Sequence, residues 1–259
     1  MDIQPKAIDA LRLDTQPVRP LQGEAASSPD LNLDPRFQLF IEPRSVAGEC
    51  FRMLRAKILA KKTGPLPRSI MVTSPQPMDG KTTVAANLAA SIARGINEHV
   101  LLVDCDLRRP AMATMFGINA DQGIREYLEH GDTIEPYLMK TPIPKLTLLP
   151  SGKPPVNPSE LLSSDKMKTL VRELKMRYED RFVVFDATPA QFGAETTFLA
   201  SMVDAVLLVV RYGKTPRDLI AEAIENIGPE KILGIVFNAT QRPPKGYQYY
   251  YRYYRKQPD

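Results

Sequence analysis

A Gly-Lys-Thr triplet at residues 80–82 lies between an apolar run and an alanine-rich segment. The apolar run, residues 69–73, has the length and composition of a buried strand, and residues 81–94 have the character of a helix. A triplet in this position binds phosphate, because the unpaired N–H groups and the positive dipole end of the helix face the anion. We therefore expect Lys81 to contact the β- and γ-phosphates of ATP, and the Thr82 hydroxyl to contact Mg²⁺.

The loop before the triplet departs from the usual G-x-x-x-x-G-K-T pattern. Pro75 takes the place of the first glycine, and Met78 stands where such loops usually have another glycine. If the backbone at Met78 needs a positive φ, methionine costs about 1 kcal/mol there, which would weaken phosphate binding without abolishing it. The residues that we expect to surround the phosphates are Pro77, Met78, Asp79, Gly80, Lys81, Thr82 and Thr83.

Three aspartates follow apolar runs further along the chain. Asp104 and Asp106 come after residues 100–103, and Asp186 follows residues 182–185. Open α/β sheets bind ligands beyond the carboxyl ends of their strands, so these carboxylates fall where the phosphates are expected. We expect Asp186 and Asp104 to position Mg²⁺ or its water, and Asp104 or Asp106 to accept the proton of an attacking hydroxyl. The alternative is a solvated turn in which Asp104 and Asp106 only cap a helix.

Strand-like apolar runs alternate with helical segments from residue 69 to residue 237. This alternation predicts an α/β fold, a mostly parallel sheet with helices on both faces. The expected strands are residues 69–73, 100–103, 146–149, 182–185, 205–210 and 231–237. The expected organisation is a disordered arm at 1–36, a phosphate-loop domain at 37–240 and a flexible tyrosine-rich tail at 241–259.

The composition excludes several other classes of protein. The chain has 259 residues, of which 43% are hydrophobic and 25% charged, as in a soluble globular protein. No apolar run approaches the ~20 residues of a membrane-spanning helix, and the first residues lack the pattern of a signal peptide, so we expect a cytoplasmic protein. Two cysteines and two histidines give no disulfide framework and no zinc-ligand spacing. A net charge of +4 is too small to indicate nucleic acid, and none is expected as a partner.

The motifs occur in a characteristic order: G-K-T at residues 80–82, D-x-D-x-R at 104–108 and D-x-x-P at 186–189. This order resembles that of the bacterial tyrosine kinases, the phosphate-loop autokinases of capsule and exopolysaccharide assembly, which are related to the MinD/ParA ATPases. The similarity covers roughly residues 40–259. It implies that Arg108, the last residue of the second motif, contributes to nucleotide binding.

Two further segments match the same family. Glu49, Arg52 and Arg55 form an E-x-x-R-x-x-R motif, which in the family makes contacts between the subunits of a ring. The tail carries a tyrosine cluster like the family's C-terminal phosphoacceptors, namely Tyr247, Tyr249, Tyr250, Tyr251, Tyr253 and Tyr254. Each segment also has a plainer interpretation: ion pairs within one helix for the first, and an unmodified aromatic tail for the second.

The resemblance implies an autokinase that uses ATP and Mg²⁺ to phosphorylate the tail of a neighbouring copy and so regulates polysaccharide polymerisation and export. It implies two partners: further copies of the chain, and a transmembrane chain-length (copolymerase-type) protein that activates the kinase and recruits it to the inner face of the membrane. Met78 and Asp79 depart from the family loop and leave open a nucleotide-binding regulator with weak or no kinase activity. A MinD/ParA-type ATPase is the other alternative, although Gln76 replaces the lysine that those proteins carry five residues before Lys81.

Overall fold

The computed structural model describes residues 33–37, 45–60, 64–131, 133–177 and 181–240. The predicted arm lies outside these residues apart from 33–36, and the predicted tail lies outside them entirely. All the described elements belong to one unit of the chain, and they confirm the predicted α/β fold.

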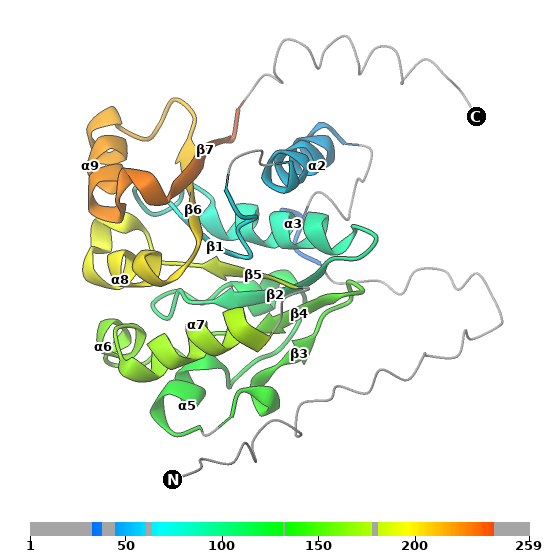
Figure 1. The fold of residues 1–259 in the computed structure, drawn as a ribbon, viewed down its shortest axis with the longest axis vertical. Helices are drawn as coiled ribbons and strands as arrows, with labels where there is room; N and C mark the ends of the chain where they lie inside the picture. Colours follow the sequence, from blue (N-terminus) through cyan, green and yellow to red (C-terminus); the bar gives the residue numbers. More distant parts are fainter. Residues whose placement is uncertain (1–32, 38–44, 61–63, 132, 178–180, 241–259) are drawn as a thin grey trace, which may run out of the picture. The chain divides into compact units, whose positions relative to one another are not determined.

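Within the described residues, seven strands form one sheet in the order β3-β4-β2-β5-β1-β6-β7, and Figure 1 shows them from the lower edge, β3, to the upper edge, β7. Neighbouring strands are parallel, except for the antiparallel pair β3 and β4. The strands are β1 (Ser69–Thr73), β2 (His99–Asp104), β3 (Met139–Lys140), β4 (Leu146–Leu149), β5 (Arg181–Asp186), β6 (Ala205–Arg211) and β7 (Ile232–Asn238). Strand β1, which lies between β5 and β6, is buried along its whole length, as expected for a strand of a parallel sheet that is covered on both faces.

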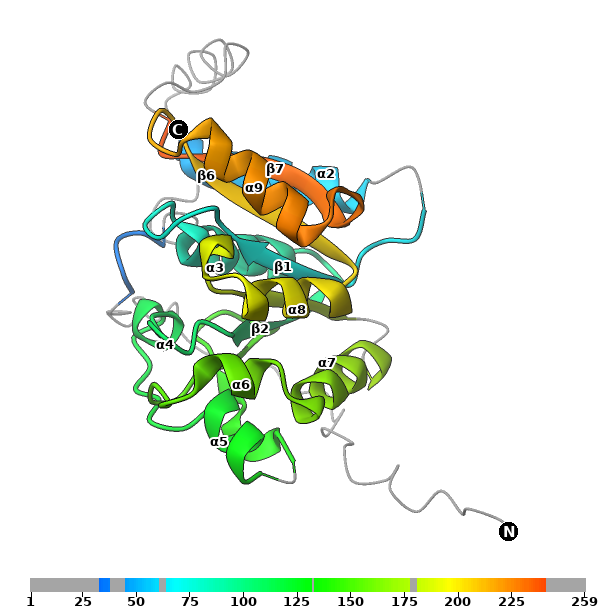
Figure 2. The same ribbon diagram turned by 90° about the vertical axis from the view of Figure 1, so that its left-hand side faces the viewer.

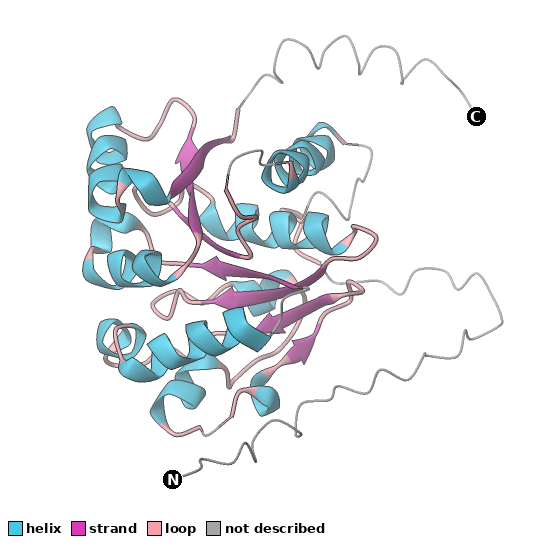
Figure 3. Cartoon of the chain, viewed as in Figure 1, coloured by secondary structure: helices cyan, strands magenta, loops and turns pink. Residues whose placement is uncertain are grey.

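Helices cover both faces of the sheet (Figures 1, 2 and 3), and each face has its own hydrophobic core. On one face lie α2 (Val46–Leu59), α3 (Lys81–Ala93) and α4 (Met112–Met115). On the other lie α5 (Ile124–Glu129), α6 (Pro158–Leu162), α7 (Asp165–Arg177), α8 (Ala194–Met202) and α9 (Arg217–Ile227). Three short 3₁₀ helices complete the described elements: η1 (Glu135–Tyr137), η2 (Ala190–Phe192) and η3 (Pro229–Lys231). None of the helices in the described ranges combines the length and apolarity needed to cross a bilayer.

Helix α3 lies close to the sheet because small side chains line it. Eleven residues of α3 are buried, and five of these are alanines. Alanine lets the backbones of helix and sheet approach closely, at the high packing density that is usual in protein interiors. The N-terminus of α3 is thereby fixed beyond the carboxyl end of β1, where the Gly-Lys-Thr triplet lies.

Two features of the fold were not predicted from the sequence. Strand β3 has only two residues, too few to give a periodic pattern, and it pairs antiparallel with β4. Phe37 is fully buried and packs edge-to-face against Phe116, with 5.0 Å between the ring centroids. Close to it, the Asp34 N–H donates to the Met115 carbonyl at 3.2 Å. Residues 33–37 therefore contact the end of α4.

Candidate nucleotide-binding and phosphoryl-transfer site

Two residues of the loop between β1 and α3 have left-handed backbone conformations. Gly80 has a φ of 96°, and Met78 has a φ of 69°. Met78 therefore has the positive φ on which the expected cost depended. This conformation costs a residue with a side chain roughly 1 kcal/mol. The Met78 side chain is 78% exposed, and its packing therefore offsets little of that cost.

Side chains of β6, of β7 and of the segment after β6 donate hydrogen bonds that support the loop between β1 and α3. Arg211 Nη1 donates to the Met78 carbonyl at 3.1 Å. Thr215 Oγ1 donates to Asp79 Oδ1, and Asn238 Nδ2 donates to the Asp79 carbonyl, each at 2.9 Å. The bonded residues are at least 133 positions apart in the sequence, so no local pattern could have shown that these side chains belong to the site.

Asp79 and Gly80 both depend on this support. The Asp79 side chain is buried and also accepts a hydrogen bond from Gln76 Nε2 at 3.2 Å, so it faces the rest of the protein and leaves its backbone for the phosphates. At Gly80 a Cβ would lie 2.1 Å from Asn238 Nδ2. Only glycine combines that close contact with the positive φ at this position.

Lys81 lies between two of the predicted carboxylates. Its Nζ is 2.7 Å from Asp106 Oδ2 and 3.3 Å from Asp186 Oδ1, and it donates to Thr82 Oγ1 at 3.1 Å. Burial by itself lowers the pKa of Lys81, but the negative charges of Asp186 and Asp106 raise it by more than burial lowers it. The pKa of Lys81 therefore lies above its ordinary value. The ammonium group therefore stays charged. The structure brings together the side chains that the sequence analysis assigned to phosphate, magnesium and proton transfer.

Asp104 and Asp106 have different surroundings, although they are two residues apart. Asp104 is fully buried, and its two oxygens accept the backbone N–H groups of Asp106 and Met112, both at 3.2 Å. Burial, and then the charge of Asp186, raise the pKa of Asp104 to about 7. Asp106 directs one oxygen to Lys81 and accepts the Arg109 N–H with the other, at 3.1 Å. Asp104 therefore supports the turn, and Asp106 faces Lys81.

The donor set fits Mg²⁺ bound together with a nucleotide. One ammonium group contacts two carboxylates, Asp106 and Asp186, which leaves an excess of negative charge that a divalent cation would neutralise. Asp186 Oδ2 is buried and has no hydrogen-bond partner among the described residues. No group of three or more His, Cys, Asp or Glu side chains within the described ranges could hold a metal alone. Mg²⁺ commonly uses one or two carboxylates, waters and substrate phosphates, so this set is sufficient.

Arg108 makes its contacts away from this cluster. Its Nε lies 2.9 Å from Glu195 Oε1, and its Nη2 donates to Ser159 Oγ at 2.9 Å. Ser159 Oγ in turn donates to the other Glu195 oxygen at 2.6 Å. The guanidinium also lies over the Phe192 ring, 5.5 Å from its centroid. The residue that the sequence analysis assigned to the nucleotide is thus bound to α6 and α8 through a buried glutamate.

The E-x-x-R-x-x-R motif lies on α2 and has partners within the chain. Arg52 forms an ion pair with Glu49 on the same helix, as the plainer interpretation predicted. Arg55 Nη1 donates to the Ser91 carbonyl of α3 at 2.7 Å and so joins the two helices. The side chains of Arg52 and Glu49 are 35% and 30% exposed, so a neighbouring molecule could still reach them. The predicted phosphoacceptors from Tyr247 to Tyr254 lie outside the described residues.

The sheet is mostly parallel, and beyond the carboxyl end of β1 lie a Gly-Lys-Thr loop, a helix N-terminus and a lysine between two carboxylates. This combination defines a phosphate-loop NTPase. The family model described as an AAA domain matches residues 70–227. The tyrosine-protein kinase YwqD of Bacillus subtilis is 35% identical over 202 residues, which cover 77% of this chain and 84% of that protein. The chain belongs to the bacterial tyrosine-protein kinases.

Two other matches are to a longer protein and to a chimerical one. The tyrosine-protein kinase ptk of Acinetobacter johnsonii is 30% identical over 205 residues, which cover 78% of this chain but only 27% of that protein. The solved structure of the chimerical protein CapA2B2 has a TM-score of 0.72 and 31% sequence identity, and the match covers 80% of this chain and 91% of that one. The similarity therefore covers about a quarter of the Acinetobacter johnsonii protein and most of the Bacillus subtilis kinase and of the chimerical protein.

Proposed function

We propose that this kinase transfers the γ-phosphoryl group of ATP to tyrosines in the tail of a neighbouring copy, and that this reaction regulates exopolysaccharide or capsule polymerisation and export. The observation that carries the proposal is the placement of Lys81 at the N-terminus of α3, with Asp106 and Asp186 on either side. The family resemblance and the six tyrosines between Tyr247 and Tyr254 support the choice of acceptor.

Each side chain of the cluster has a proposed role. Lys81 stabilises the charge that develops on the transferred phosphoryl group. Thr82 and Asp186 would hold Mg²⁺, and the ion would neutralise negative charge on the phosphates. The tyrosine hydroxyl gives its proton to a carboxylate as its oxygen bonds to phosphorus, and the bond from phosphorus to the departing ADP breaks. Asp106 is assigned to accept that proton in preference to Asp104, because Asp106 directs Oδ2 to Lys81, whereas Asp104 accepts backbone N–H groups with both oxygens.

Two asparagine variants separate these roles. Asp106→Asn is expected to bind ATP and magnesium within a few-fold of the wild type and to lose tyrosine labelling from radioactive ATP by about 10²–10⁴-fold. Asp104→Asn is expected to lower the melting temperature, because its amide NH₂ would face a backbone N–H. The assignment of Asp106 fails if Asp106→Asn labels normally while Asp104→Asn keeps its stability and does not label.

Transfer between copies is tested with two full-length variants. Lys81→Met keeps the tail but lacks the phosphate-binding lysine, and a second variant keeps the site but has phenylalanine at all six tail tyrosines. Neither is expected to become labelled alone. In a mixture, label should appear on the Lys81→Met copy, which a size tag identifies. If wild type is labelled and the mixture is not, transfer occurs within one chain.

The alternative of a nucleotide-binding regulator has one specific observation in its favour, the strained backbone at Met78. It predicts that the wild type binds ATP with magnesium and becomes thermally more stable, without labelling its tyrosines, even when the cytoplasmic segment of a membrane activator is present. Ligand at about 100 times its dissociation constant adds ~2.7 kcal/mol to the free energy of unfolding, so binding is readily detected. A chain that shows this shift and never labels tyrosine would support the regulator.

We further propose that Glu49, Arg52 and Arg55 contribute to a contact between copies in a ring. The support is the family motif and the partial exposure of the first two side chains. Glu49→Gln and Arg52→Gln together should reduce the mass seen by sedimentation at high concentration. Arg55→Gln is the informative comparison: it is expected to lower stability as well, because it removes the bond to Ser91. Unchanged mass in the double variant would contradict the interface.

The proposed activator is a transmembrane chain-length protein that brings the kinase to the inner face of the membrane. The support is the resemblance, together with the greater length of relatives such as the Acinetobacter johnsonii kinase. Co-expression with such a protein should move the chain to the membrane fraction and increase tyrosine labelling. An unchanged distribution and unchanged labelling with every such protein encoded beside it would count against the proposal.

A further inference from the structure

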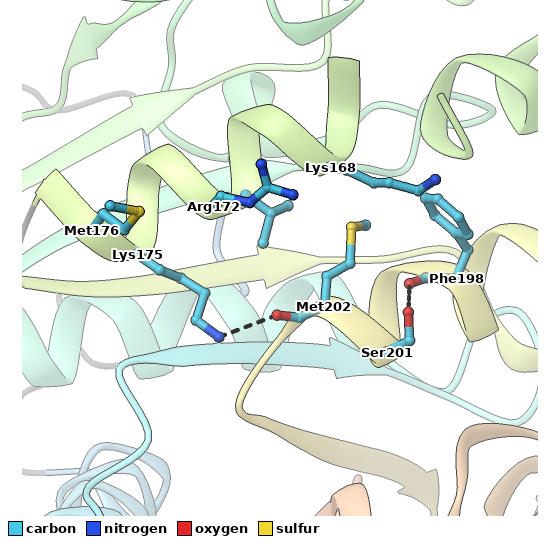
Figure 4. Close-up of a pocket in the computed structure, with 8 residues that line it drawn as sticks. Lys168, Arg172, Lys175, Met176, Phe198, Ser201 and Met202 are labelled. Carbon is cyan, nitrogen blue, oxygen red and sulfur yellow. Dashed lines mark hydrogen bonds between the residues drawn. The ribbon is translucent and has the colours of Figure 1, made fainter. Parts of the chain in front are cut away.

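A groove between α7 and α8 combines cations with apolar side chains and lies outside the site described above. Its cavity has a volume of about 430 Å³, within the ~300–1,000 Å³ that is usual for sites that bind small ligands. Figure 4 shows the lining side chains of both helices. The cations are Lys168, Arg172 and Lys175, all on α7, and none of the described residues that line the groove is a carboxylate.

The three cations differ in how strongly they already interact with other groups of the protein. Arg172 is exposed, and its guanidinium has no partner among the described residues. Lys168 pairs with Asp165 at 2.7 Å, but that carboxylate is 94% exposed, so the pair contributes little and the lysine can turn to another anion. Lys175 has a structural role, because its Nζ lies 2.6 Å from Asp204 and donates to the Met202 carbonyl at 3.2 Å. Two cations are therefore available for an anionic ligand.

The apolar side chains suit a flat aromatic ring. Met176 is 72% exposed, and Phe198 and Met202 line the groove from α8. Methionine and phenylalanine make favourable contacts with aromatic rings, through sulfur and through edge-to-face packing. Lys168 Nζ already lies 5.2 Å from the centroid of the Phe198 ring, so a cation and an aromatic surface are adjacent. An aromatic group that ends in an anion matches this combination.

We propose that this groove binds phosphotyrosine in the tail of the chain itself, residues 247–254, with the phosphate on Arg172 and Lys168 and the ring against Phe198 and Met202. The proposal rests on the proposed function as the source of the phosphates. Arginine binds phosphate through two parallel N–H donors, which favours Arg172 as the principal contact. Charge also distinguishes the unphosphorylated tail from the phosphorylated one. Without phosphate, residues 241–259 carry five cations and one aspartate, so the cations of the groove repel them. About three phosphates, each near −1.5 to −2, reverse that charge.

The experiment uses the unphosphorylated full-length chain and labelled synthetic peptides of residues 241–259, with binding followed by fluorescence anisotropy. A peptide phosphorylated at Tyr249, Tyr251 and Tyr253 should bind at least tenfold more tightly than the unmodified peptide. Arg172→Glu should remove at least tenfold of that affinity, whereas Arg217→Glu, a matched change at an exposed arginine on α9, should leave it unchanged. Equal binding of the two peptides, or equal affinity of Arg172→Glu and wild type, overturns the proposal.

Three further measurements exclude other sites and ligands. A peptide with phosphoserine at the same positions should bind less tightly, because it lacks the ring; equal binding contradicts the role of Phe198 and Met202. Excess ADP with magnesium should not displace the phosphopeptide, and displacement would place it at the Lys81 loop instead. Retention of the chain by phosphatidylglycerol vesicles through Arg172, without phosphopeptide binding, would make the groove a lipid-binding surface and refute the proposal. Because the phosphates are synthetic, a failure of the kinase proposal leaves the peptide result interpretable.

Discussion

Replacing Met78 by glycine tests how this protein tolerates a side chain in a strained loop. The φ of 69° lies in the left-handed region, which costs a residue with a Cβ roughly 1–2 kcal/mol. Glycine removes that cost, but it adds ~0.4–1 kcal/mol of conformational entropy to the unfolded chain. The matched control is Met78→Ala, which also loses the methionine side chain and keeps the Cβ. The difference between the two variants therefore isolates the backbone term.

The central values of these two ranges, about 1.5 and about 0.7 kcal/mol, predict that Met78→Gly is more stable than Met78→Ala by about 0.8 kcal/mol. For a domain of this size that corresponds to a difference in melting temperature of about 1–4 °C, which differential scanning calorimetry resolves. The loss of the side chain itself matters little, because 78% of it is exposed. The dissociation constant for ATP with magnesium should change by less than about threefold in both variants. The reason is that Arg211, Thr215 and Asn238 support the same loop conformation in each.

Two results would refute this reasoning. An alanine variant as stable as the glycine variant would show that the strain at residue 78 does not exceed the ~0.4–1 kcal/mol of entropy that glycine adds to the unfolded chain. A tenfold gain in ATP affinity in Met78→Gly, without a matching gain in Met78→Ala, would show that the wild-type loop is not preformed and that ATP has to order it. Isothermal titration calorimetry on the three proteins distinguishes these cases from the expected outcome.

Three shorter predictions concern other parts of the molecule. Gly80→Ala should weaken binding of ATP with magnesium by tenfold or more in calorimetry, because its Cβ would displace Asn238 from the loop; affinity equal to wild type would contradict the contact. Phe37→Ala should cost about 3–5 kcal/mol in urea unfolding, because Phe37 is fully buried against Phe116, and a cost below ~1 kcal/mol would show that residues 33–37 do not pack there. Burial raises the pKa of Asp204, but the hydrogen bonds from Lys175 and from the Ser69 N–H lower it by more, so the pKa of Asp204 is depressed in the folded protein. The ionised Asp204 therefore stabilises the fold above the unfolded pKa of ~3.9, and this stabilisation is lost as the pH falls below that value. The gap in unfolding free energy between wild type and Asp204→Asn should therefore shrink from pH 6 to pH 3, and a constant gap would contradict the shift.

Local patterns in the sequence predicted most of the fold. The strands at Ser69–Thr73 and Leu146–Leu149 have the expected bounds, and the helix expected at 81–94 runs from Lys81 to Ala93, because their apolar patterns and flanking residues are strong. The order of strands is not encoded locally. The neighbouring places of β2, β5 and β1, which bring Asp104 next to Asp186, follow from packing of the whole sheet.

The site shows the same division between local and distant information. Lys81, Asp106 and Asp186 could be predicted because each belongs to a motif at the end of a strand. Asp104 and Asp106 look alike in the sequence, and only the folded turn distinguishes one that accepts two backbone N–H groups from one that faces Lys81. Arg108 is directed by Glu195, which is 87 residues away and has no motif of its own.

The alanines of α3 determine how freely this protein can change. Alanine is the smallest side chain that still favours a helix, so a substitution at these positions cannot reduce the side-chain volume without weakening the helix. Any larger residue at Ala85, Ala86, Ala89 or Ala90 would overpack the space against the sheet. Such a residue would push α3 outward and carry Lys81 with it. Substitutions that abolish activity without touching a ligand should therefore be concentrated behind the nucleotide, along this helix. The rim of the site, where Met78 projects into solvent, should accept far more variation.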